Sequence, residues 1–187
     1  ASAKDETILM LGPWNHTSLN TRKTSFGEVQ YGTNAGIDYD AELLRWFDVQ
    51  LKDEEKKNPL PAVSIFTMGE NKWHSEKEWP LSRAIPVSYY LSYSGKEKNS
   101  GTLLNQIHEN EKSVSYVFDP ANPVWDKSYE KSYPYDQGAI ESRSDVVVFT
   151  TAPLDHDVEV TGEIIAELFV SSTSSDTDFS FTLCDVY

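Results

Sequence analysis

The stretch Ile-Leu-Met-Leu-Gly-Pro-Trp-Asn-His at residues 8–16 decides how the first part of this 187-residue chain folds. Four consecutive apolar residues that stop at a Gly-Pro pair are typical of a buried parallel strand. A parallel strand requires a crossover connection, and the pattern after it predicts a helix with Asp38 as its N-cap. Apolar residues recur there at steps of three and four, as an amphipathic helix requires: Ile37, Ala41, Leu44, Phe47 and Leu51.

A charged, helix-breaking stretch follows the predicted helix. Lys52–Asn58 reads KDEEKKN and is closed by Pro59 and Pro61, which marks a domain boundary. We therefore predict two parts, residues 1–57 from the carboxyl end of an α/β domain and residues 58–187 from a second domain. One strand and one helix cannot complete a parallel sheet, so we expect the chain to be an interior segment of a longer polypeptide.

Beyond residue 61 the apolar residues alternate with a period of two, which predicts half-buried antiparallel strands. Turn-rich stretches separate these segments, and the stretch 125–143 reads as a long loop. The fold class is therefore predicted to be mainly β, an incomplete β-sandwich or jelly roll preceded by a terminal strand and helix of α/β type. The alternating segments are 87–93, 114–118, 158–160, 164–170 and 179–183.

Charge and composition exclude several classes of partner. Thirty acidic against 16 basic side chains give a net charge of −14, which argues against binding to nucleic acid or to an anionic membrane surface. The apolar runs are too short to span a bilayer. A single cysteine excludes an internal disulfide framework, and no Cys/His spacing indicates zinc. Neutral or cationic partners and homo-oligomerisation stay open, and the sequence does not assign a compartment.

His16 is the candidate catalytic residue because it lies a few residues past the carboxyl end of the predicted strand, where ligands bind in open α/β sheets. In α/β-hydrolases the histidine of the catalytic triad follows the serine and the acid in the chain and comes from a loop after a late strand. The alternative is a loop histidine bonded to backbone. The sequence contains no GxSxG, and Asp5 would lie at the opposite end of the strand from His16, so the nucleophile and the acid are expected outside this chain.

The other candidates have simpler interpretations. Trp14 and Asn15 either wall a substrate pocket or pack in the turn, with packing favoured. His74, His108 and His156 are expected at the surface without ligating partners, and Asp176, Asp178 and Asp185 are expected to cap turns rather than to bind calcium. Cys184 is predicted to be an inert buried thiol. We expect no metal and no cofactor.

An ordered series of motifs covers the whole chain. The first are GPWNH (12–16), DYDAELLRWFDVQLK (38–52) and PAVSIFTMGENKW (61–73), and the later ones are YVFDPANPV (116–124), DVVVFTTAPL (145–154), VEVTG (158–162) and DTDFSFTLCDV (176–186). Together they resemble the X-Pro dipeptidyl-peptidase and cocaine-esterase-like serine hydrolases. The stretch 125–138 departs from the Pro and paired glycines often found there in that family.

The resemblance implies that residues 1–57 end an α/β-hydrolase domain and that residues 58–187 form a jelly roll of the galactose-binding type, truncated at its carboxyl end. It implies a serine acyl hydrolase in which His16 is the triad base. The implied partners are the catalytic domain of the same polypeptide and a small acyl ester, amide or short peptide substrate, with X-Pro peptides and β-lactam side-chain amides among the family's substrates. The alternative function is a non-catalytic carbohydrate- or protein-binding module.

Overall fold

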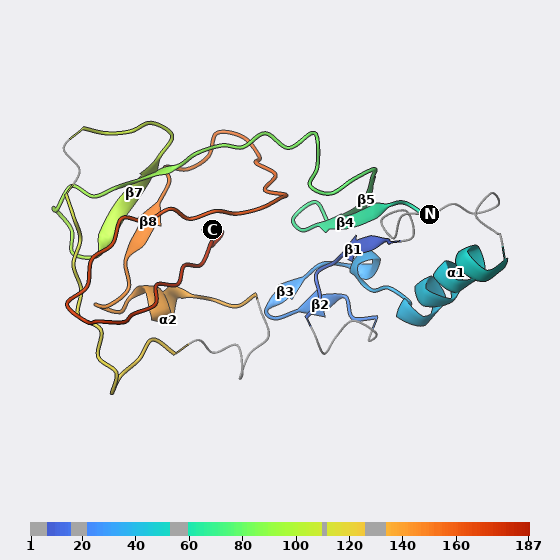
Figure 1. Cartoon of the computed structure of the whole chain (residues 1–187), viewed down its shortest axis with the longest axis horizontal. Helices are drawn as coiled ribbons and strands as arrows, with labels where there is room; N and C mark the ends of the chain where they lie inside the picture. The colour runs from blue at the N-terminus through green and yellow to red at the C-terminus, as the bar shows by residue number, and fades with distance from the viewer. Residues whose placement is uncertain (1–6, 16–21, 53–59, 110–111, 126–133) are drawn as a thin grey trace.

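The computed structural model describes residues 7–15, 22–52, 60–109, 112–125 and 134–187 of the chain. These residues form two lobes that lie side by side (Figure 1). The first lobe holds the strands β1 to β5 and the helix α1, and the second holds β6 to β8, the short helix α2 and the carboxyl-terminal segment. No helix within the described ranges has the length and apolar character needed to cross a membrane.

A three-stranded sheet organises the first lobe. Its strands are β1 (Leu9–Leu11), β4 (Val63–Thr67) and β5 (Lys72–Glu76), in the order β1-β4-β5. β1 and β4 are parallel, while β4 and β5 form an antiparallel pair. The connection from β1 to β4 contains β2 (Ser25–Phe26), β3 (Val29–Gln30), the 3-10 turn η2 (Thr33–Ala35) and α1 (Tyr39–Lys52). The predicted parallel strand and crossover helix are therefore both present, but β1 is not buried as predicted: Leu9 and Met10 are half-buried and Leu11 is 37% exposed.

The sheet extends across the boundary predicted at residues 57 and 58. β4 begins after that boundary, yet it pairs with β1 in the register Leu9↔Val63. Four consecutive residues of β4, from Val63 to Phe66, are buried, as in a parallel strand covered on both faces. The second lobe therefore does not begin directly after the charged stretch. The division at 57/58 stays a prediction about which part of the chain folds independently.

The helix α1 begins as the sequence predicts. The backbone N–H of Ala41 donates to Asp38 Oδ1 at 3.2 Å, which is the side-chain bond of an N-cap. The apolar face has no cover among the described residues: no α1 side chain is buried, and Leu44 and Leu51 are 60% and 76% exposed. The amphipathic pattern thus predicts the helix correctly but does not supply the surface on which it packs.

The second lobe contains a three-stranded sheet in the order β6-β7-β8. β6 (Tyr90–Ser92) and β7 (Ser100–Leu104) are antiparallel, and β7 and β8 (Val148–Thr150) are parallel. The helix α2 (Gly138–Glu141) lies within the stretch 125–143, which the sequence analysis expected to be a loop throughout. That expectation was wrong for these four residues.

The fold class is confirmed: the structure is mainly β with few helices, and its sheets are open. Four of the five alternating segments are not strands, and the pairing of β7 with β8 is parallel where antiparallel strands were predicted. The segments 114–118, 158–160, 164–170 and 179–183 lie in the described part of the chain and carry no strand assignment, and Phe169 is 98% exposed. Alternation determines which face of a strand is apolar, whereas a strand also needs a partner for its backbone hydrogen bonds.

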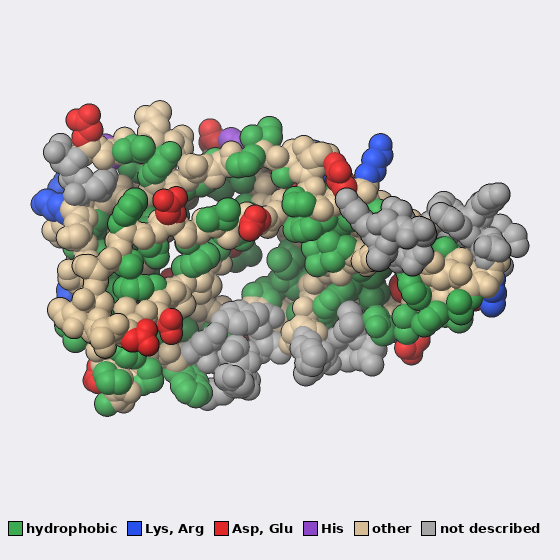
Figure 2. Space-filling view, viewed as in Figure 1, with side chains coloured by type: hydrophobic (Ala, Val, Ile, Leu, Met, Phe, Trp, Pro, Cys, Tyr) green, Lys and Arg blue, Asp and Glu red, His purple; other side chains and the backbone are tan. Residues whose placement is uncertain are grey.

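Polar contacts between described residues connect the lobes at two places or more. The backbone N–H of Glu28, at the turn between β2 and β3, donates to the Pro134 carbonyl at 2.8 Å, and Glu28 Oε2 accepts from the backbone N–H of Asp136 at 3.0 Å. Arg83 contacts both Glu76 of β5 at 2.8 Å and Glu159 at 2.9 Å. The space-filling view shows an open gap between the lobes (Figure 2).

Candidate functional site

A tight turn follows β1 at the position expected for the functional loop. The backbone N–H of Trp14 donates to the Gly12 carbonyl at 2.9 Å, so the chain reverses within three residues. A Cβ on Gly12 would lie 2.2 Å from a ring carbon of Trp14, so the indole lies directly over this glycine. His16 lies outside the described residues, and its candidate role stays a prediction. Its neighbour Asn15 ends the described turn.

The turn rests on an aromatic cluster. The ring of Trp14 packs on that of Trp73, with centroids 5.6 Å apart and planes inclined at 36°. Trp73 also makes an edge contact with Phe66 at 5.4 Å, and its Nε1–H donates to the Asn34 carbonyl at 2.8 Å. The packing interpretation of Trp14 is therefore confirmed. The buried members of the cluster are Phe26, Tyr31, Ala35 and Phe66.

After residues 16–21 the described chain resumes at Arg22, which contacts Gly36 and Asp38. Arg22 has a left-handed backbone, with φ of 51°, and its guanidinium donates to the Asp38 carboxylate. A Cβ on Gly36 would lie 2.5 Å from the Arg22 carbonyl oxygen, so the two backbones are in close contact. Arg22 thus contacts residues 33–38 directly. Trp14, on the other side of His16 in the sequence, contacts Trp73, which hydrogen-bonds to Asn34.

The other histidines lie at the surface, as predicted, but two of them have carboxylate neighbours that the sequence analysis did not foresee. His74 Nε2 lies 2.9 Å from Glu70 Oε2, and His156 Nδ1 lies 2.5 Å from Asp155 Oδ1. Lys72 and His74 both hydrogen-bond to Glu70 and lower the pKa of that carboxyl group. His108 is exposed. None of the three lies in the turn after β1.

Cys184 is exposed, which corrects the prediction of a buried thiol. Its strand partner is missing from the described residues, so the alternating pattern around it does not produce a covered face. Partial burial, followed by the charge and hydrogen bond of Glu141, raises the pKa of the thiol. The thiol is therefore protonated at neutral pH, a state in which it is a poor nucleophile.

A search of the described residues for metal ligands finds no group of three or more His, Cys, Asp or Glu side chains that could hold an ion. Asp176, Asp178 and Asp185, which the sequence analysis weighed against a calcium site, are all exposed. The structure thus provides no cluster on which metal chemistry could be argued.

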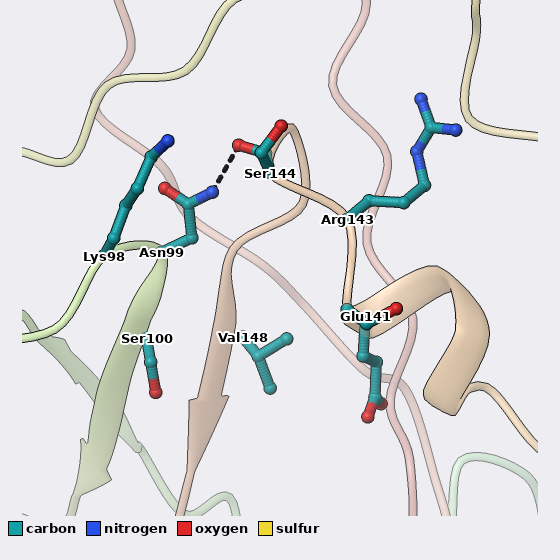
Figure 3. A pocket seen from close by; sticks show the side chains of 8 residues that line it. Lys98, Asn99, Ser100, Glu141, Arg143, Ser144 and Val148 are labelled. Atoms are coloured by element: carbon teal, nitrogen blue, oxygen red, sulfur yellow. Dashed lines mark hydrogen bonds between the residues drawn. The ribbon is translucent and has the colours of Figure 1, made fainter.

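A pocket of about 340 Å³ lies in the second lobe, between α2 and the sheet (Figure 3). Two of its polar side chains have partners: Asn99 donates to the Ser144 carbonyl, and Arg143 extends away from Asn99 to bond Asp145 at 2.7 Å. The lining contains three serines but no histidine to activate them. It consists of Lys98, Asn99, Ser100, Glu141, Ser142, Arg143, Ser144 and Val148.

The family model described as the X-Pro dipeptidyl-peptidase C-terminal non-catalytic domain matches residues 55–187. The chain belongs to this family. The X-Pro dipeptidyl-peptidase resemblance read from the sequence motifs is thereby confirmed, and the matched range includes β4 and β5 as well as the whole second lobe.

Individual relatives agree with the X-Pro dipeptidyl-peptidase family assignment. The chain is 35% identical to the cocaine esterase of Rhodococcus sp. (strain MB1 Bresler) over 96% of its own length and 33% of the esterase. It is 34% identical to a provisionally named serine esterase of Mycobacterium bovis, over 95% of the chain and 28% of that protein. These relatives are esterase-type hydrolases, and this chain spans about a third of their length or less.

Among solved structures, the chain resembles an aminopeptidase from the marine sediment archaeon Thaumarchaeota archaeon. The TM-score is 0.57 at 28% identity, covering 82% of this chain and 26% of the aminopeptidase. Sequence reasoning missed Trp73 and Asn34 as neighbours of the turn after β1. Trp73 is part of a quoted motif, but its contact with Trp14 joins residues 59 positions apart, so no local spacing indicates it.

Proposed function

We propose that this chain is a segment of a serine acyl hydrolase of the α/β-hydrolase type, and that His16 is its general base. The observation that carries the proposal is topological. β1 is parallel to β4, α1 lies in the connection between them, and Gly12–Asn15 leaves the carboxyl end of β1 directly before His16. Ligands of open α/β sheets bind at this end of parallel strands. The esterase names of the relatives support the same reaction class.

In the proposed mechanism a serine outside this chain attacks the carbonyl carbon of a small acyl ester, amide or short peptide. His16 accepts the hydroxyl proton as the C–O bond to serine forms, and then donates it to the leaving alcohol or amine. Water attacks the acyl-enzyme in the second half, and His16 again takes and returns the proton. A carboxylate outside the chain orients the imidazole, and backbone N–H groups there stabilise the oxyanion.

The second lobe packs, in this proposal, against the catalytic domain of the same polypeptide and closes one side of the substrate cleft. The alternative of a carbohydrate- or protein-binding module is supported only by the analogy of the jelly roll. Homo-oligomerisation is compatible with either function.

The test is His16→Ala in the full-length protein, with His74→Ala as the matched control. We expect His16→Ala to lower kcat for a p-nitrophenyl ester by roughly four orders of magnitude or more, because triad members act as a unit. His74→Ala should leave kcat nearly unchanged, since His74 bonds only to Glu70 at the surface of β5. The wild-type rate should fall as pH drops through about 6.5, the ordinary pKa of histidine.

Two results would contradict the proposal. One is retention of more than about a tenth of the activity by His16→Ala, which a triad base does not permit. The other is ester hydrolysis by the isolated 187-residue chain that His16→Ala leaves unaffected. The first result would favour the binding-module alternative, and the second would mean that the chain hydrolyses esters without using His16.

A further inference from the structure

The turn that precedes His16 is in contact with a side chain from a distant part of the chain. Trp73 contacts Trp14 by its ring and Asn34 by its N–H, and Trp14 covers Gly12. We propose that Trp73 is a positioning residue for the catalytic histidine, acting through Trp14 on the turn Gly12–Asn15. This inference rests on the proposed role of His16.

Trp73 is well suited to this role because it is held from three sides. It lies on β5 directly opposite Phe66 of β4, and the two rings make an edge contact at 5.4 Å. Its Nε1–H donates to Asn34, a residue of η2. A ring that is fixed by a strand register, an aromatic edge and a directional hydrogen bond presents one defined face to Trp14.

Trp14 transmits this position over a short distance. Its ring lies over Gly12, its backbone N–H bonds the Gly12 carbonyl, and only Asn15 separates it from His16. The turn therefore cannot rotate independently of the Trp14 ring. A displacement of about 1 Å in a catalytic group costs up to about 100-fold in rate. Removal of the Trp73 ring should accordingly lower the rate of the chemical step, measured by kcat, more than it changes substrate binding.

The segment that accepts the hydrogen bond from Trp73 also contacts Arg22, where the described chain resumes after residue 21. Asn34 precedes Gly36 and Asp38, which contact the backbone and the guanidinium of Arg22 respectively. The segment 33–38 thus connects to the chain on both sides of residues 16–21. Through Asn34, Trp73 therefore contacts the same segment, residues 33–38, that contacts Arg22.

The experiment compares Trp73→Leu, Trp73→Phe and Leu81→Ala in the full-length protein, with kcat and KM measured on a p-nitrophenyl ester. Leu81 is the control because it is buried, at 5% exposure, and packs with Val63 and Ile65 in a cluster separate from that of Trp14 and Trp73. We expect Trp73→Leu to lower kcat by about 10- to 100-fold with KM changed less than about 3-fold. Trp73→Phe, which keeps a ring but loses the N–H, should lie in between. Leu81→Ala should lower the unfolding temperature without lowering kcat.

A second measurement tests the route through Trp14. Trp14→Leu should lower kcat like Trp73→Leu, and the double variant should lose little more than either single one, because both changes remove one coupled contact. Equal losses of kcat in Trp73→Leu and Leu81→Ala, or additive losses in the double variant, would overturn the proposal. If Trp73→Leu fails to fold, an unchanged kcat in Trp73→Phe and in Trp14→Leu has the same meaning.

The result for His16→Ala distinguishes failure of the positioning role from failure of the proposed function. An inactive His16→Ala together with a fully active Trp73→Leu would overturn the positioning role and leave the proposed function intact. An active His16→Ala would overturn the proposed function, and the positioning role with it.

Discussion

Gly12 is a residue at which a larger side chain has no room in the structure. A methyl group there would meet the Trp14 ring at 2.2 Å, and that ring cannot retreat because Trp73 lies behind it. We expect Gly12→Ala to destabilise the full-length protein by about 1–3 kcal/mol, the usual cost of overpacking, in urea unfolding. In a Trp14→Ala background the same change should cost less than about 1 kcal/mol, because the obstructing ring is gone.

Gly69→Ala is the matched control for that prediction. Gly69 has φ of 89° and an open environment, so an alanine there pays for its backbone conformation and not for a clash. Its cost should be the same with and without Trp14. If the cost of Gly12→Ala were also independent of Trp14, the clash would not be its cause.

At the residue scale, sequence reasoning succeeded where cause and effect are close in the chain. Asp38 was predicted as an N-cap because a cap bonds the backbone N–H three residues later, and Ala41 is that partner. Cys184 was misjudged because burial depends on a neighbouring strand that its own alternating pattern does not provide. The contact between Trp14 and Trp73 was unpredictable for the same reason, since it depends on the register of β4 and β5.

At the scale of elements, Asp38 connects the start of α1 to Arg22. It caps the helix through Oδ1 and receives the guanidinium of Arg22 on Oδ2. We expect Asp38→Ala to cost about 1 kcal/mol more than Asp38→Asn in denaturant unfolding, because asparagine caps a helix about as well as aspartate. Both variants lose the exposed ion pair, so their difference isolates the cap.

Arg22→Gln completes that comparison. It removes the ion pair and leaves the cap, so its effect should resemble that of Asp38→Asn and should shrink in high salt. Equal unfolding free energies for Asp38→Ala and Asp38→Asn would show that the cap contributes nothing to α1.

The elements themselves were predicted unequally. Periodicity located α1 within a few residues, because a 14-residue helix offers several turns of pattern. The strand β6 lies inside the predicted segment 87–93, whereas 164–170 and 179–183 alternate as clearly and remain without ladder partners. A single strand's sequence determines its faces but not its neighbour, and sheet pairing is a property of two segments.

At the scale of the whole molecule, the two-residue alternation of apolar residues predicted the mainly β class, while the charged stretch did not predict where one sheet ends. The run Val63–Thr67 was assigned to the second domain because it follows that stretch, yet it pairs with β1. Contacts between the lobes were outside the reach of the sequence, since Glu28 meets Asp136 across 108 residues and Arg83 meets Glu159 across 76.

The Arg83 contact gives the molecule a pH-dependent connection between its lobes. The hydrogen bond from Arg83, and next that from Thr161, lowers the pKa of Glu159 below its ordinary value of 4.5. A carboxylate with a lowered pKa in the folded state stabilises that state above its ordinary pKa. The contribution disappears as pH falls through the lower, folded value. The connection should therefore be complete at neutral pH and lost only below about pH 4.5.

We expect Glu159→Gln to lower the unfolding temperature of the full-length protein at pH 7, and the difference from wild type to shrink toward zero below pH 4.5. The side chains of Arg83 and Glu159 are 48% and 41% exposed, so the shift should be small and should decrease with added salt. Arg83 keeps Glu76 in the variant, so the substitution changes the contact between the lobes and the local hydrogen bond from Thr161 to Glu159. Glu163→Gln, an equal change of charge four residues further along the same exposed segment, is the control and should show no such dependence on pH. A difference that persists unchanged from pH 7 to pH 3.5 would mean that Glu159 does not act through its carboxylate, and the two lobes would then be held together without this ion pair.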